Sequence, residues 1–134
     1  MSVESRLTYV DSSAIVKLAV SEPESAALRR YLARRRPLVS SALARPEVGR
    51  ALLPLGPEAV ARGEDVLRRI QLLRINDRVL RSAATLEPAE IRSLDAIHLA
   101  SARQFMPALH RLVTYDGRMA DAALAIGLSV AAPS

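Results

Sequence analysis

The chain alternates short apolar runs with segments whose apolar residues recur at helical spacing, and this alternation restricts the fold more than any other feature. Residues 7–10 form the first apolar run, and residues 12–19 follow it with apolar side chains three or four positions apart. Short apolar runs are typical of buried strands, and strands that alternate with helices indicate a parallel sheet. The pattern therefore predicts an α/β fold rather than a helical bundle.

The same reading along the chain predicts four to five short strands separated by helices. We expect strands at residues 7–10, 38–39, 73–75, 111–115 and 128–131. We expect helices at residues 12–19, 22–36, 41–53, 58–72, 78–86, 94–105 and 118–126. Asp77 and Ser93 are suitable N-caps for two of them. Pro46 lies inside a third, so that helix either begins near Arg45 or kinks there. We find no repeat, low-complexity stretch or linker, and expect a single domain over residues 1–134.

Composition excludes several classes of protein. Half of the 134 residues are apolar and the mean hydropathy is +0.13, which is enough for a packed core and argues against disorder. The chain has no cysteine, so disulfides, iron–sulfur clusters and thiolate zinc sites are excluded. No apolar run approaches the roughly 18 residues of a membrane span, and residues 1–11 lack the apolar core of a signal peptide. We therefore expect a cytoplasmic protein with no membrane partner.

The charge balance favours an anionic partner. The chain carries 19 basic and 14 acidic residues, a formal net charge of +5, and Lys17 is its only lysine. Such a balance favours nucleic acid over membrane as the partner, although an arginine-rich, lysine-poor composition is also what a GC-rich genome produces. With only three tyrosines, one phenylalanine and no tryptophan, we expect contacts to phosphates rather than base stacking on an aromatic platform.

Four acidic residues occupy positions that suggest a shared site. Asp11 and Asp116 each directly follow a predicted strand, and ligand sites of open parallel sheets form at the carboxyl ends of strands. Glu47 and Asp95 lie near helix starts among apolar residues, where an unpaired carboxylate is costly to desolvate. Carboxylate oxygens suit a hard divalent cation, so the four acids together predict a metal site.

Each acid also has a plainer interpretation. Asp11 is a possible N-cap, Asp116 precedes a glycine as in an ordinary turn, and Glu47 and Asp95 would both favour a helix dipole. It is the coincidence of all four that favours function. The remaining aspartates, Asp65, Asp77 and Asp121, have the polar surroundings of surface residues. Asp121 is also near enough to Asp116 to be considered as an accessory acid.

The two histidines and the glycines add little. His98 lies three residues after Asp95 and could share its helix face as a ligand, but a histidine in an apolar helix is more often a packed core residue. There is no HExxH, G-x-S-x-G, Walker-type or G-x-G-x-x-G sequence. Receiver domains need an acidic pair near the first strand and a late lysine, and haloacid-dehalogenase-type phosphatases need Asp-x-Asp; this chain has Asp11-Ser12-Ser13.

Four ordered motifs resemble those of PIN domains, in particular the VapC-type toxin ribonucleases. They span nearly the whole chain and are Tyr9-Val10-Asp11-Ser12-Ser13-Ala14, then Val39-Ser40-Ser41 with Pro46-Glu47-Val48, then Leu94-Asp95-Ala96-Ile97-His98-Leu99-Ala100, then Val113-Thr114-Tyr115-Asp116. The third is the most specific. Pro46 directly before the second acid departs from the pattern.

The resemblance implies a three-layer α/β/α fold with a parallel sheet and a metal-dependent endoribonuclease. By matched position, Asp11, Asp95 and Asp116 would hold Mg²⁺ or Mn²⁺, and Glu47 would bind it directly or through a water. It also implies an RNA substrate, a cognate antitoxin and a homodimer.

Four further residues are expected to support the site. Ser12, Ser13 and Thr114 would orient carboxylates or water, although helix capping and strand packing explain them equally well. Arg118 is the cation best placed for a phosphate or a partner's carboxylate. Two rival hypotheses remain: a PIN nuclease of RNA processing or quality control without an antitoxin, and a non-catalytic, metal-stabilised domain that binds RNA or a partner.

Overall fold

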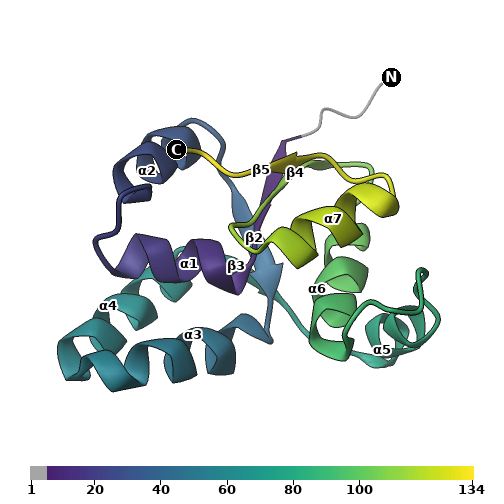
Figure 1. Ribbon diagram of the computed structural model, residues 1–134, viewed down its shortest axis with the longest axis horizontal. Coiled ribbons are helices and arrows are strands. Elements are labelled where there is room, and N and C mark those ends of the chain that lie inside the picture. Colours follow the sequence, from purple (N-terminus) through teal and green to yellow (C-terminus); the bar gives the residue numbers. More distant parts are fainter. Residues whose placement is uncertain (1–5) are drawn as a thin grey trace.

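The computed structural model describes residues 6–134, and within them a five-stranded parallel sheet separates two layers of helices (Figure 1). The five residues before them, on which the expectation of no leader partly rests, lie outside this range. The strands are β1 (Leu7–Val10), β2 (Leu38–Ser41), β3 (Gln71–Leu73), β4 (Leu109–Val113) and β5 (Val130–Ala131). The helices are α1 (Ser12–Ala19), α2 (Ser25–Ala33), α3 (Ala44–Leu52), α4 (Pro57–Arg68), α5 (Asp77–Ala84), α6 (Ser93–Arg103) and α7 (Gly117–Ala125), with a 3₁₀ turn η1 (Leu53–Leu55).

The sheet order is β3-β2-β1-β4-β5, and every pairing is parallel. Helices α1 to α4 lie on one side of it and α5 to α7 on the other, so the predicted three-layer α/β/α fold is confirmed (Figure 1). The chain leaves β1 toward β2 on one side and reaches β4 on the other. In such sheets the point where the strand order reverses is where ligand sites form, and here that point lies between the carboxyl ends of β1 and β4.

The sheet is buried on both faces because successive strand residues point to opposite layers. Tyr9 and Leu112 pack with α6 and α7, whereas Val10 and Val113, one residue later, pack with α1, α3 and α4. All four side chains are fully buried. This explains why the strands read as continuous apolar runs. No helix in residues 6–134 is long and apolar enough to cross a membrane.

The largest differences from the predicted elements occur at their ends. Asn76, not Asp77, caps α5, since its Oδ1 accepts a hydrogen bond from the amide of Val79 at 3.0 Å. Helix α6 has no side-chain cap, although Ser93 was predicted to supply one. Pro46 occupies the third position of α3 without a break, because the amides of a first turn have no helical acceptor and the missing N–H costs nothing there.

Candidate active site

The four predicted acids lie at the carboxyl edge of the sheet. Asp11 directly follows β1, and Asp116 follows β4 after a two-residue extension. Glu47 and Asp95 lie in the first turns of α3 and α6, the helices on opposite sides of the sheet. Because β1 and β4 are neighbours and both helices begin near this edge, residues up to 105 positions apart in the chain share one region.

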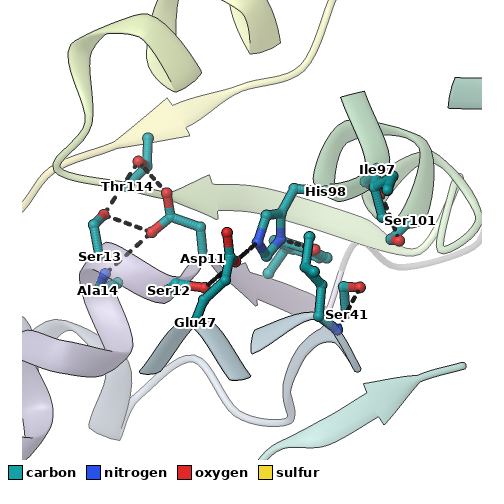
Figure 2. A network of polar contacts seen from close by, with 12 residues as sticks. Asp11, Ser12, Ser13, Ala14, Ser41, Glu47, Ile97, His98, Ser101 and Thr114 are labelled. Carbon is teal, nitrogen blue, oxygen red and sulfur yellow. Dashed lines mark hydrogen bonds and ion pairs between the residues drawn. The ribbon is translucent and has the colours of Figure 1, made fainter. Parts of the chain in front are cut away.

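Asp11 is almost fully buried, and its carboxylate accepts hydrogen bonds from three groups. Oδ1 accepts from the hydroxyl of Ser13 at 2.6 Å and from the amide of Ala14 at 3.1 Å, while the hydroxyl of Thr114 donates to Oδ2 (Figure 2). Asp11 is thus the N-cap of α1, as the plainer interpretation had it. Burial raises the pKa of its carboxyl although these hydrogen bonds oppose the rise. These hydrogen bonds connect the buried carboxylate, which directly follows β1, to α1 and to the end of β4.

Ser13 and Thr114 also tie the backbone beyond β4 to the same point. Ser13 Oγ accepts from the amide of Tyr115 at 2.9 Å, and Thr114 Oγ1 accepts from the amide of Asp116 at 3.0 Å. The two hydroxyls lie 3.4 Å apart. The segment that carries Asp116 is therefore oriented by the same pair of hydroxyls that holds Asp11.

Glu47 is held by a second chain of hydrogen bonds. Its Oε1 accepts from Ser12 Oγ at 2.6 Å and lies 2.6 Å from His98 Nε2 (Figure 2). The Tyr9 hydroxyl lies 2.7 Å from His98 Nδ1. A carboxylate only accepts, so Nε2 carries the proton and a neutral His98 accepts from Tyr9 at Nδ1. Burial raises the pKa of Glu47, but the hydrogen bonds from His98 and Ser12 outweigh it and leave that pKa below its usual value.

The sequence indicated little of this second network. His98 is buried and hydrogen-bonded, as expected of a core histidine, yet its partner is one of the four acids. Tyr9 is fully buried in a strand, where an aromatic side chain is ordinarily part of the core. The one available signal was the Asp95-x-x-His98 spacing, which suggested a shared helix face but not a contact with Glu47.

Asp95 differs from the two held carboxylates because, among residues 6–134, its side chain has no hydrogen bond or ion pair. It is half-buried at the start of α6. Burial and the negative charges of Asp116 and Glu47 raise its pKa, while His98 and Arg92 oppose the rise. Asp95 therefore feels both neighbouring acids, and the three carboxylates form one patch of negative charge that His98 and Arg92 offset only in part.

Asp116 is exposed and caps α7. Its Oδ1 accepts from the amides of Arg118 at 2.9 Å and Met119 at 3.5 Å. No other hydrogen bond is made by this carboxylate within the described part of the chain, so Oδ2 remains open to a ligand. The Arg118 and Asp121 side chains are exposed on α7 beside Asp95.

The donor set suits a hard divalent cation because it consists of carboxylate oxygens supported by hydroxyls. Over residues 6–134, however, no three His, Asp or Glu side chains are arranged as a ready-made metal site. Asp11 and Glu47 are engaged by protein donors, and like charges repel in the absence of a cation. A metal would therefore draw Asp95 and Asp116 toward the two held carboxylates.

Comparison with known proteins agrees with this geometry. The family model "PIN domain" matches residues 8–124. Ribonuclease VapC46 of Mycobacterium tuberculosis (strain ATCC 25618 / H37Rv) is 60% identical over 126 residues, which cover 94% of this chain and 97% of the relative.

Two solved structures share the fold at low sequence identity. The crystal structure of Mycobacterium tuberculosis VapC20, a Sarcin-Ricin loop cleaving toxin, superposes with a TM-score of 0.72 at 18% identity, over 94% of this chain and 99% of that one. A toxin–antitoxin complex from Klebsiella pneumoniae gives a TM-score of 0.73 at 19% identity, over 95% and 98%. The ordered acidic motifs, the α/β/α architecture and these similarities show that the chain belongs to the PIN-domain family, among its VapC ribonucleases.

Proposed function

We propose that this protein is a metal-dependent endoribonuclease and the toxin of a toxin–antitoxin pair. The observation that carries the proposal is the cluster of carboxylates at the switch point of the sheet, of which Asp95 has no hydrogen-bond partner in residues 6–134. There, burial and the charges of Asp116 and Glu47 raise the pKa of Asp95. A cluster of this kind is unfavourable alone and becomes favourable around a cation. The VapC relatives supply the reaction class.

Asp11, Asp95 and Asp116 would hold Mg²⁺ or Mn²⁺, and Glu47 would bind it directly or through a water. A cation held by these residues would supply Lewis-acid chemistry: polarisation of an RNA phosphodiester, a lower pKa for a bound water and neutralisation of charge on the leaving oxygen. The chain's own part is positioning. Ser13 and Thr114 hold Asp11, while Ser12 and His98 hold Oε1 of Glu47 and leave Oε2 without a hydrogen bond from residues 6–134.

The test of catalysis is cleavage of varied RNAs with Mg²⁺ or Mn²⁺ by the wild type, Asp95→Asn and the matched control Asp65→Asn. Asp65 is an exposed acid on α4, and its one ion pair within residues 6–134 is with Arg68. We expect Asp65→Asn to cleave RNA at the rate of the wild type. The cleavage rate of Asp95→Asn should fall at least about a hundredfold, as when a group that stabilises charge in the transition state is removed. An inert wild type, or an Asp95→Asn variant that cuts equally well, contradicts the proposal.

We further propose an RNA substrate in the cytoplasm, a cognate antitoxin and a homodimer. Support for a partner surface comes from Leu53 and Leu55 of η1, which are 57% and 62% exposed. Expression should be toxic, and co-expression of a small neighbouring DNA-binding protein should relieve the toxicity. If expression is harmless while RNA is still cut in vitro, a processing nuclease without an antitoxin is the better description. Light scattering on Leu53→Ser/Leu55→Ser against the wild type tests the dimer.

A further inference from the structure

A hollow of about 470 Å³ adjoins the carboxylate patch and has Asp95 in its wall. Its walls are the segment before α6, the first turn of α6 and one face of α7, and they include Ile91, Arg92, Asp95, Arg118, Asp121 and Ala125. The volume lies within the range of pockets that hold small organic ligands. Asp95 belongs both to this hollow and to the proposed metal site, so a substrate held at that site would lie next to the hollow.

The charged side chains of the hollow are not used by the protein. Within residues 6–134, neither Arg92 nor Arg118 donates a side-chain hydrogen bond or forms an ion pair, and the carboxylates of Glu90 and Asp121 likewise have no partner. Arg92 lies close enough to oppose the rise in the pKa of Asp95. Two arginines therefore line the hollow together with acids and apolar residues, and one of them, Arg92, lies near Asp95.

We propose that this hollow binds the nucleotide next to the scissile phosphodiester and selects its base. This inference rests on the proposed function and adds its substrate preference. Arg92 and Arg118 would hold the neighbouring phosphate, since guanidinium groups pair with phosphate oxygens. The base would lie against Ile91 and Ala125, and the Asp121 carboxylate would accept from its N–H groups.

The chemistry of a carboxylate points to one base. A carboxylate has only acceptors, so it favours bases that present N–H donors on an exposed edge. Guanine presents two adjacent donors, its ring N–H and its exocyclic amino group, which match the two oxygens of one carboxylate. Uracil presents a single N–H between two carbonyl oxygens, which a carboxylate repels. The hollow therefore favours guanine and disfavours uracil. An acidic peptide of a partner protein would meet repulsion from Glu90 and Asp121.

The experiment maps cleavage sites on an RNA pool with random sequence, comparing the wild type, Asp121→Asn, Ala125→Leu and Asp65→Asn. We expect the wild type and Asp65→Asn to cut preferentially beside guanine. Asp121→Asn should reduce the ratio of cleavage beside guanine to cleavage beside uracil about tenfold, which is the discrimination that one good base contact supplies. Ala125→Leu narrows the hollow from an exposed position of α7 and should weaken the preference while the protein remains folded. Identical maps for the wild type and Asp121→Asn, or no base preference, overturn the inference.

A second measurement separates failure of this inference from failure of the proposed function. If the wild type cleaves no RNA, the function is wrong, and the hollow is then judged by NMR titration of the protein with guanosine and uridine monophosphates in Mg²⁺. Shifts of the Ala122 and Ala125 amides with the guanosine nucleotide, reduced in Asp121→Asn, support a nucleotide site. Absence of such shifts with the guanosine nucleotide overturns the proposal of a nucleotide site.

Discussion

At the residue scale, the site shows how a structural role and a chemical one coexist on the same side chain. Asp11 and Asp116 are both helix N-caps, and each accepts amides of the first turn of its helix through Oδ1. A carboxylate has two oxygens and about four lone-pair sites, so capping leaves room for a ligand. Both acids are helix N-caps, and the capping hydrogen bonds also fix the orientation of their carboxylates.

The Tyr9 hydroxyl is the least obvious of these contributions. Tyr9→Phe keeps the ring in the core but leaves His98 Nδ1 without its partner in a buried position. A buried polar atom left unsatisfied costs about 1–3 kcal/mol, so we expect the free energy of unfolding to fall by that amount in urea titrations. Tyr31→Phe is the matched control, since that hydroxyl makes no hydrogen bond in the described structure, and it should change stability by less than about 0.5 kcal/mol. Equal effects of the two changes would contradict this account.

Asp95 makes stability depend on pH in an unusual direction. Burial and the charges of Asp116 and Glu47 hold its folded-state pKa above the ordinary 3.8, so the folded protein retains a proton that the unfolded chain has released. Stability due to Asp95 therefore falls as the pH rises through this interval. In EDTA at pH 7, Asp95→Asn should melt about 1–3 °C above the wild type, and the difference should vanish below about pH 4.

Glu47→Gln is the control of opposite sign. The hydrogen bonds of Glu47 leave its folded-state pKa below the ordinary 4.5, so its contribution is present above that value and is lost as the pH falls through the folded-state pKa. We expect Glu47→Gln to melt below the wild type at pH 7 in scanning calorimetry. A lower melting temperature for Asp95→Asn at pH 7 would show that its charge is compensated in the folded state.

At the scale of elements, the position of Glu47 depends on how α3 packs against α4. A Cβ added to Gly63 of α4 would lie 2.4 Å from Leu52 Cδ1 of α3, so the fully buried Leu52 side chain would have to shift. Gly63 is thus required by the close approach of the two helices, although glycine is a poor helix former.

The two helical glycines of this pair should respond oppositely to alanine. Gly63→Ala gains about 1 kcal/mol of helix propensity but overpacks the interface, and we expect a net loss of about 1–2 kcal/mol. Gly49→Ala in α3 meets no atom within 4 Å and should stabilise the protein by about 0.5–1 kcal/mol. Denaturant midpoints at constant m-value measure both. Stabilisation by both substitutions would mean that α3 and α4 lie farther apart than described.

At the scale of the whole molecule, the net charge is positive whereas the candidate active site is negative. The net charge of +5 attracts RNA, while the carboxylate patch repels the phosphate that must reach it. Without a cation the two effects oppose each other, and with one they act together.

This opposition predicts that one inactivating substitution improves RNA binding. In EDTA, Asp95→Asn should bind a labelled single-stranded RNA about two- to fivefold more tightly than the wild type, because it removes a charge at the site of phosphate contact. Asp65→Asn changes the net charge equally but lies outside the site, and at 0.15 M salt screening should leave it close to the wild type. Fluorescence anisotropy measures all three. If both variants gain equally, net charge rather than the site governs binding.

The sequence by itself determined what depends on neighbours along the chain. Apolar runs and helical spacing predicted the strands and helices because these patterns recur every two to four residues. Capping chemistry was less reliable at this range, since Asn76 and Asp77 are adjacent and both suitable, and only the backbone conformation distinguishes them. The ordered positions of Asp11, Glu47, Asp95 and Asp116 were equally visible, because each follows a strand or opens a helix.

Tertiary structure alone decided which side chains hold those acids and what lies beside them. Tyr9 and His98 are 89 positions apart, and Thr114 and Asp11 are 103 apart. No local pattern encodes such pairings, because they arise when the sheet brings β1, β4 and α6 together. The hollow beside Asp95 is likewise a product of packing, since its walls come from two helices and a connecting segment that meet only in the folded chain.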